Sequence, residues 1–337
     1  MNAPKKNRPL AIVIEAAASY AIGLACLWRV FHKLPLRPFL RSLAGLNVWL
    51  LAVGGALALA AYLCVAWEWQ FLLRPVGRLP FWKAARAVLG GRFANDVLPL
   101  HVGCVARILL AGRWLRASVA ALAPSLIVER LWDGLWLVVG TTALSFAAPL
   151  PPEVLRARNF LAVLVLAGIA AAGAVFLRRS PATDSRPGIL GRIKLFFDNM
   201  AAGTRGLVRA RVLAPVMVLS LLKLAVQAAA ILVLLRACHI QLPLAAGLGV
   251  FVAGYLAVCV PAAPAGAGLF QLFVAGFLGF CGIDKAPAAS FSLVSFVALT
   301  LPPALAGFFA LAGSGISLRR LRQSAANLTD SASGGIV

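Results

Sequence analysis

Six long apolar runs dominate this chain, and a helix of about 20 apolar residues is enough to cross the hydrocarbon core of a bilayer. We expect spanning helices at Leu10–Trp28, Leu43–Leu73, Ala117–Pro149, Phe160–Leu177, Leu213–Leu235 and Ala286–Ser314. Apolar residues make up 62% of the sequence and charged residues 12%, whereas a soluble domain is roughly half apolar and a quarter charged. Lipid must therefore solvate much of the surface, and the sequence predicts an all-α polytopic membrane protein.

Two further apolar segments, residues 81–111 and 244–281, are interrupted by proline and glycine. The breaks carry Pro99 and Gly103 in the first segment, and Pro261, Pro264, Gly266 and Gly268 in the second. Proline removes an amide donor and glycine loosens a helix. Irregular backbone is tolerated at hydrocarbon depth only where it faces protein or water. Both segments are therefore predicted to be re-entrant helical hairpins that turn near mid-depth.

The distribution of Lys and Arg favours one orientation. With the N-terminus in the cytoplasm, the inner loops hold 22 basic residues and the outer loops hold 8. We therefore expect residues 1–9 and a disordered tail, residues 316–337, to lie in the cytoplasm of a bacterium, flanking one domain in its inner (plasma) membrane, residues 10–315. The two hairpins then enter from opposite sides, which is compatible with an inverted repeat and a site at the midplane.

The net charge of +22 would also suit a nucleic-acid binder. The basic residues, however, lie between apolar segments and not on one soluble face, so we expect no nucleic-acid partner. Residues 189–211 mix basic and apolar side chains. They are expected to form an interfacial amphipathic helix on an anionic leaflet, with a plain cytoplasmic loop as the alternative.

Charges inside a predicted span are the strongest chemical signal. Glu129, Arg130 and Asp133 lie within the run Ala117–Pro149, where ionised side chains are costly and should be paired and interior-facing. Glu129 and Asp133 are one helical turn apart and share a face, while Arg130 beside them could bind a lipid phosphate. The alternative is a structural ion pair that locks helices together.

A second polar cluster surrounds the turn of the first hairpin and comprises Arg92, Asn95, Asp96 and Arg107. It could form a phosphate-binding pocket, or it could cap the following helix and anchor the segment at the membrane surface. Near the second turn the polar residue is Gln271. The simpler interpretation of this small-residue turn is tight helix packing. The alternative is that backbone amides at a helix N-terminus there bind an anionic headgroup.

Other polar residues occur singly in the spans: Glu15, Glu68, Lys223 and Gln227. Each is a weaker candidate to line a groove. The six cysteines form no CxxC pair and the three histidines lie far apart, so we expect no metal site and no redox motif. We also find no P-loop and expect no cofactor.

In order along the chain, these motifs resemble the flippase-like membrane domain of the lysylphosphatidylglycerol synthase transmembrane family. The matching stretches are the N-x-x-x-P-x-x-x-G-x-x-x-R pattern of Asn95–Arg107, the E-R-x-x-D pattern of Glu129–Asp133, and the P-x-x-P-x-G-x-G region within Val260–Gln271. The resemblance covers residues 10–315 and extends to stand-alone proteins, including a hopanoid-associated branch. It implies a lipid translocator that binds an anionic headgroup in an intramembrane groove.

Two departures qualify that implication, because the family usually has glutamate where this chain has Cys104 and Gln271. Only a short tail follows Arg322, so we expect no soluble aminoacyl-transferase domain and no lysyltransferase activity. The expected partners are membrane lipids and other lipid-biosynthesis proteins. The alternative function is an accessory or enzymatic component of hopanoid or lipid-linked glycan biosynthesis, with Glu129 or Asp133 as a general base.

Overall fold

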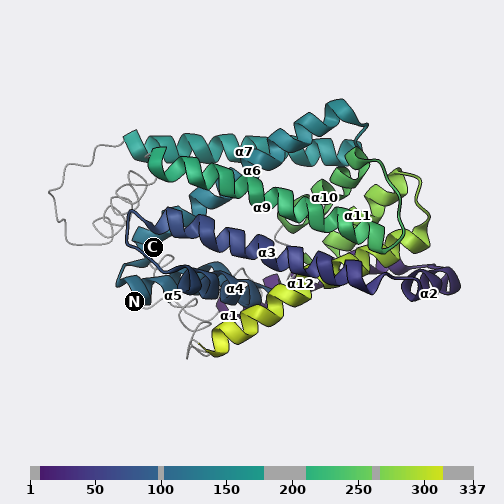
Figure 1. Cartoon of the computed structure of the whole chain (residues 1–337), viewed down its shortest axis with the longest axis horizontal. Helices are drawn as coiled ribbons and strands as arrows, with labels where there is room; N and C mark the ends of the chain where they lie inside the picture. The colour runs from purple at the N-terminus through teal and green to yellow at the C-terminus, as the bar shows by residue number, and fades with distance from the viewer. Residues whose placement is uncertain (1–7, 98–101, 178–209, 260–265, 314–337) are drawn as a thin grey trace.

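The computed structural model describes residues 8–97, 102–177, 210–259 and 266–313, and its regular elements there are all helices (Figure 1). They are α1 (Arg8–Phe31), α2 (Leu36–Ala44), α3 (Val48–Leu73), α4 (Phe81–Val97), α5 (Val102–Leu115), α6 (Val119–Ala147), α7 (Pro152–Leu177), α9 (Ala210–Ala237), α10 (Leu244–Cys259), α11 (Leu269–Phe280) and α12 (Lys285–Ala312). The predicted all-α membrane fold is confirmed.

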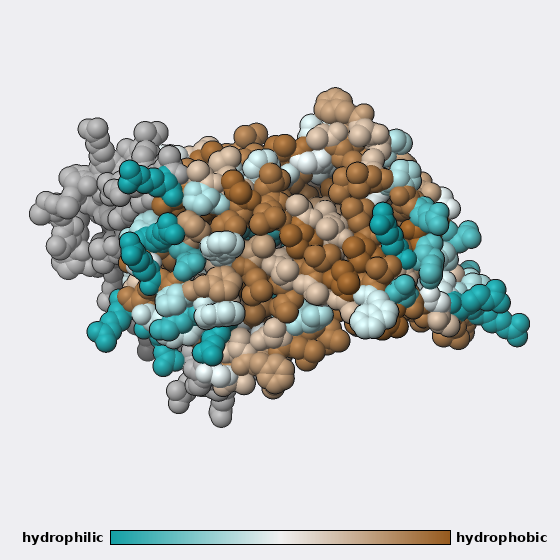
Figure 2. Space-filling model, viewed as in Figure 1, coloured by the Kyte–Doolittle hydropathy of each residue, from teal (hydrophilic) through white to brown (hydrophobic). Residues whose placement is uncertain are grey.

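Four of these helices are long and apolar enough to cross a membrane, namely α3, α7, α9 and α12. The other two predicted spans form α1, with 24 residues, and α6, with 29 residues and three charges near its middle. Most of the long helices run along the longest axis of the molecule (Figure 1). Apolar residues cover the middle of the visible face, and hydrophilic residues gather toward its two ends (Figure 2). This is the surface expected of a protein whose middle faces lipid.

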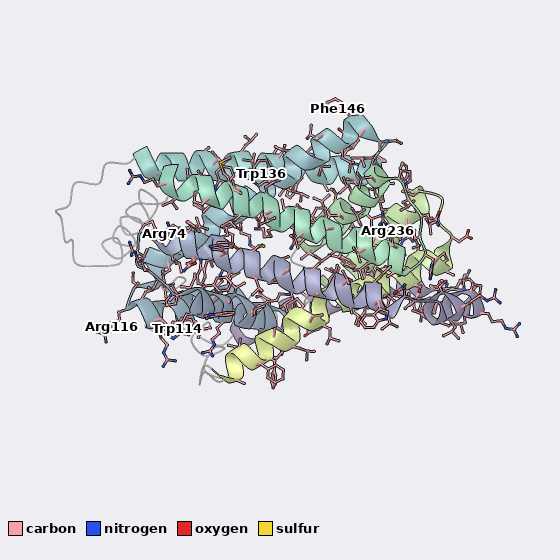
Figure 3. The ribbon with its side chains drawn as sticks, in the orientation of Figure 1. Arg74, Trp114, Arg116, Trp136, Phe146 and Arg236 are labelled. Atoms are coloured by element: carbon pink, nitrogen blue, oxygen red, sulfur yellow. The ribbon has the colours of Figure 1, made fainter. Side chains whose placement is uncertain are left out.

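Arginine side chains mark both ends of the helix bundle (Figure 3). Arg74 and Arg116 lie at one end, called the Arg116 end, while Arg236 and Phe146 lie at the other, called the Arg236 end (Figure 3). The short helix α2 projects at the Arg236 end (Figure 1).

The prediction for the segment between the first two spans was wrong in part. Leu43 and Ala44, assigned to the second span, belong to the separate helix α2. Leu36, Phe39, Leu40 and Leu43 recur at helical spacing, so α2 is amphipathic. Asn47 begins α3, and its side chain accepts a hydrogen bond from the amide of Leu50 at 3.1 Å.

The two interrupted segments form the helix pairs α4–α5 and α10–α11, and within each pair the two helices pack against each other. Their re-entrant course in the membrane stays a prediction. Their helices have 17, 14, 16 and 12 residues, which at 1.5 Å per residue is too short to cross roughly 30 Å of hydrocarbon. Figure 1 shows α4 and α5 toward the Arg116 end and α10 and α11 toward the Arg236 end. The prolines expected at the turns, Pro99, Pro261 and Pro264, lie outside the described residues.

The apolar core follows the same division. One cluster joins α3, α4, α5 and the first part of α6 around Trp69 and Leu122. The other joins the last part of α6 with α9, α10, α11 and α12 around Leu234 and Phe291. The long helices α3 and α9 pack against each other and α12 packs against α3 and α4. The expected interfacial helix at residues 189–211 falls almost wholly outside the described residues, as does the tail.

Candidate functional site

Arg107 and Glu129 form a buried ion pair between α5 and α6. Arg107 Nη1 donates to Glu129 Oε1 at 2.9 Å, and Nη2 donates to Oε2 at 2.6 Å. Both side chains are almost fully enclosed, with 8% and 3% of their surface exposed. A bidentate guanidinium–carboxylate pair is the strongest form of ion pair. It leaves Arg107 with little capacity to hold a headgroup phosphate as well.

An aromatic residue supports this pair from α3. The Arg107 guanidinium lies 4.0 Å from the centre of the Trp69 ring, within the range of a cation–π interaction. Trp69 Nε1 donates to Ser125 Oγ at 3.0 Å, and Ser125 in turn donates to the Leu122 carbonyl at 2.6 Å. Trp69 is fully buried. The pair is therefore fixed by three helices, α3, α5 and α6.

A second buried network centres on Lys223 of α9. Lys223 Nζ donates to Glu68 Oε2 of α3 at 3.0 Å and also to Asp133 Oδ1 of α6. Ser220, one turn before Lys223, donates to Glu68 Oε1 at 2.5 Å. Residues that the sequence presents as isolated charges in three different spans thus neutralise one another. Lys223 itself is 1% exposed, so it serves this network and not the surface.

Arg130 differs from the other cations of this region. Its side chain is 64% exposed, and its ion-pair partner among the described residues is Asp133, with 3.8 Å between Nη1 and Oδ2. Electrostatic interactions also reach it from Cys104 on α5 and Tyr255 on α10. Arg130 therefore lies between the two hairpins, near the middle of a 29-residue helix, and within the described part of the chain no hydrogen bond occupies its five donor groups.

The first hairpin is closed by a side-chain cap and a close backbone approach. Asn95 Oδ1 accepts the amide hydrogen of Gly103 at 2.7 Å, at the start of α5, so Asn95 caps the following helix as one interpretation predicted. A Cβ atom at Gly103 would clash with the carbonyl oxygen of Gly91. Glycine at position 103 thus allows α4 and α5 to touch through their backbones.

Arg92 and Asp96 do not join the cluster around Arg107. They form an ion pair one turn apart on α4, with 3.1 Å between Arg92 Nε and Asp96 Oδ2 but without hydrogen-bond geometry. The Arg92 guanidinium also lies 5.5 Å from the ring centre of Tyr62. The four polar residues expected around the first turn therefore separate into a cap, a local pair and a buried lock.

The second hairpin is closed by Gln271. Its Oε1 accepts the amide hydrogen of Gly268 at 2.6 Å, at the N-terminus of α11. Gly266 and Gly268 have φ values of +76° and +88°, where residues with a side chain are strained. A Cβ atom at Gly268 would also meet the backbone of Gly23 on α1. Gln271 is buried and acts here as a helix cap, so it does not face Arg130.

The sequence pointed to Glu129, Arg130 and Asp133 as one cluster, and the structure divides them between two networks and an open position. Glu68 and Lys223 had been noted only as single polar residues. Trp69, Ser125 and Ser220 had not been noted at all. One usable signal was the spacing of Ser220, Lys223 and Gln227, which places all three on one face of α9. Gln227 Oε1 and Trp136 Nε1 are buried without a hydrogen-bond partner among the described residues.

The six cysteines are all free. Among the described residues, no group of three or more His, Cys, Asp and Glu side chains could hold a metal ion. The residues of the two networks and the open position are Glu68, Trp69, Arg107, Glu129, Arg130, Asp133, Ser220 and Lys223, which lie on α3, α5, α6 and α9.

No curated protein matches this chain. The model of one family, the lysylphosphatidylglycerol synthase TM region, matches residues 16–307 and thus includes every residue of the networks described above. On this match over most of its length, the chain belongs to the family of the lysylphosphatidylglycerol synthase TM region.

Proposed function

We propose that this membrane protein binds the anionic headgroup of a lipid at Arg130 and moves it across the bilayer along a polar groove between the two hairpins. The family supports a role in membrane lipid biology, and the single observation that carries the finer statement is the state of Arg130. It is an exposed guanidinium near the middle of a long helix, and its ion pair with Asp133 is long; a charge so weakly paired in a span is costly unless it serves a ligand or faces water.

The two neighbouring cations, Arg107 and Lys223, are already bound by carboxylates, which leaves Arg130 as the candidate to bind a headgroup. Arg107 is bound bidentately by Glu129, and Lys223 is shared between Glu68 and Asp133. Neither can turn to a ligand without leaving a carboxylate buried and unpaired. Among the described residues, the ion pair that holds Arg130 is its long contact with Asp133, whose other oxygen already accepts from Lys223. A phosphate could therefore take Arg130 from Asp133 at little cost.

The geometry of the hairpins supports transport as well as binding. The acyl chains of a lipid can stay in the bilayer, so only its headgroup needs a polar path. Arg130 lies between a hairpin that begins and ends at the Arg116 end and one that begins and ends at the Arg236 end. A small movement of either hairpin would open the groove to one side at a time, as alternating access requires.

The proposal is tested by reconstituting the full chain in liposomes that carry fluorescent, headgroup-labelled phosphatidylglycerol or phosphatidylcholine. Wild-type protein should speed the movement of the anionic lipid above that in empty liposomes. Arg130→Gln should reduce this rate about 10- to 100-fold, because charge-assisted hydrogen bonds contribute roughly 1.5–3 kcal/mol each. Arg116→Gln, which removes an exposed charge at the end of the bundle, is the matched control. Equal rates with wild-type and empty liposomes, or an unchanged rate in Arg130→Gln, would overturn the proposal.

The same proposal includes the expected location in a bacterial inner membrane with both termini in the cytoplasm. A fluorescent reporter that folds only in the cytoplasm, fused after residue 337, should be bright. A dark reporter, together with an active periplasmic reporter at the same position, would reverse the assignment of the two ends.

A further inference from the structure

A cavity at the Arg236 end, remote from Arg130 along the chain and in the fold, has the chemistry of a second lipid site. It measures about 760 Å³ and lies between the last turns of α1, the open face of α11 and the first turn of α12. This volume falls within the range of small-molecule pockets, roughly 300–1,000 Å³. The cavity is therefore large enough to receive a headgroup and part of an acyl chain.

The rim of the cavity is basic. Arg29 and Lys33 line it from the end of α1, and Lys285 lines it from the start of α12. Lys285 Nζ donates to the His32 carbonyl oxygen at 2.5 Å, which ties the two helices together and leaves its other donors free. None of the described residues that line the cavity is acidic; the nearest acid in sequence is Asp284, exposed beside Lys285. Three cations without a lining acid attract an anion.

The floor of the cavity is apolar and open. Gly276 and Gly279 of α11 lie one turn apart, and a Cβ atom built on either would meet nothing within 4 Å. Leu272, Ala275, Ala288 and Ala289 complete this surface. Trp28 stands exposed at the edge, and tryptophan favours the boundary between headgroups and hydrocarbon. A linear hydrocarbon chain could lie directly against the backbone of α11.

We infer that this cavity binds an anionic phospholipid, with its phosphate on Arg29, Lys33 and Lys285 and an acyl chain over Gly276 and Gly279. The occupant follows from the combination of the two surfaces. A neutral lipid or a sterol would leave three cations unused, and a soluble anion would leave the glycine floor empty. The inference goes beyond transport at Arg130 and does not depend on it.

The test is native mass spectrometry of the full chain, purified in detergent and titrated with phosphatidylglycerol, phosphatidylcholine or glycerol phosphate. The triple variant Arg29→Gln, Lys33→Gln, Lys285→Gln should bind phosphatidylglycerol at least tenfold more weakly. The matched control removes three charges from the same end but outside the cavity, as Arg37→Gln, Arg41→Gln, Arg236→Gln, and should bind as wild type does. A second variant, Gly276→Leu with Gly279→Leu, fills the floor at two positions where an added Cβ meets nothing within 4 Å, and it should also bind at least tenfold more weakly.

Four outcomes would overturn the inference. They are equal binding by the triple variant and its control, equal binding of phosphatidylcholine, full competition by glycerol phosphate, and a dimer that disappears in the glycine variant. Full competition by glycerol phosphate would mean that the three cations bind a soluble anion. A dimer that disappears in the glycine variant would mean that the α11 surface of the cavity binds a second copy of this chain. The difference in phosphatidylglycerol binding between the triple variant and its control should persist when Arg130→Gln is added to both, because Arg130 does not line the cavity. Failure here is therefore distinguishable from failure of the proposed transport.

Discussion

The guanidinium of Arg107 and the carboxylate of Glu129 meet face to face between α5 and α6, through hydrogen bonds of 2.9 and 2.6 Å. The pair joins the returning arm of the first hairpin to the long helix that carries Arg130. Trp69 covers the guanidinium from α3. A buried pair of this kind contributes modest net stability while it is intact, but either partner alone is a buried, unpaired charge.

The first prediction concerns this pair. Arg107→Met and Glu129→Leu should each destabilise the protein by about 3–5 kcal/mol, because each leaves the other charge unpaired. The double variant should recover most of that loss, since two apolar side chains can pack in the same space. Thermal unfolding in one detergent measures all three.

Arg130→Met is the control for this series, because it removes an exposed arginine from the same helix and should leave the unfolding temperature nearly unchanged. A double variant as unstable as the sum of the two single variants would show that the residues act independently. That result would contradict a lock between α5 and α6.

The second prediction concerns the network around Lys223. Lys223→Met leaves Glu68 and Asp133 buried without a shared cation, so it should lower the unfolding temperature and the yield of folded protein sharply. Adding Glu68→Gln should restore part of the stability, because a neutral amide can still accept from Ser220. Ser220→Ala alone removes one hydrogen bond and should cost about 1–3 kcal/mol. If Glu68→Gln does not restore stability, the loss in Lys223→Met comes from altered packing and not from the unpaired carboxylates.

Both networks illustrate what the sequence could and could not predict. The apolar runs and their breaks were sufficient to identify the spans and both hairpins, because hydrocarbon length and backbone hydrogen bonding leave few alternatives. The charges of α6 were found for a similar reason, since ionised residues in a span demand an explanation. Their partners were not found. Arg107 and Lys223 are 22 and 90 residues distant from the carboxylates that they bind, and spacing along one helix says nothing about such pairs.

The amphipathic helix α2 shows a second limit. Of its nine residues, only Leu43 and Ala44 fell within a predicted span, and the rest were assigned to no helix because the segment is too short to cross the hydrocarbon. The helical spacing of its leucines was present but was hidden by the search for lengths near 20 residues. Asp96 shows a third limit. The sequence grouped it with its neighbour Asn95, but Asn95 caps α5 whereas Asp96 forms an ion pair with Arg92 on α4.

The third prediction uses the close approach of α4 and α5. Gly103→Ala should destabilise the protein by more than the gain in helix propensity could offset, because the new Cβ would collide with the Gly91 carbonyl and with Asn95. Gly140→Ala in α6 is the matched control, as nothing lies within 4 Å of its Cβ position. That control should be neutral or stabilising by roughly 0.5–1 kcal/mol. Equal unfolding temperatures for the two variants would mean that the backbones of the first hairpin do not touch.

The fourth prediction joins Cys104 to the proposed headgroup site. Cys104 lies on α5 within electrostatic range of Arg130, and the family resemblance places a glutamate at this position. In Cys104→Glu, the new carboxylate should compete with a lipid phosphate for the free donors of Arg130 and weaken phosphatidylglycerol binding by about tenfold or more. Cys104→Gln has nearly the same shape without the charge, so it should bind close to the wild-type level. Native mass spectrometry at matched lipid concentrations separates the two, with both substitutions made in the Arg29→Gln, Lys33→Gln, Lys285→Gln background so that the cavity at the Arg236 end does not contribute. If the neutral variant weakens binding as much as the acidic one, bulk at position 104 is responsible; if neither does, the headgroup does not approach Arg130 from the side of α5. The second result would remove the first hairpin from the path, because a charge placed on its returning arm must matter where the lipid phosphate passes between that arm and α6. The first result would keep the hairpin beside the lipid but would contradict competition for the donors of Arg130.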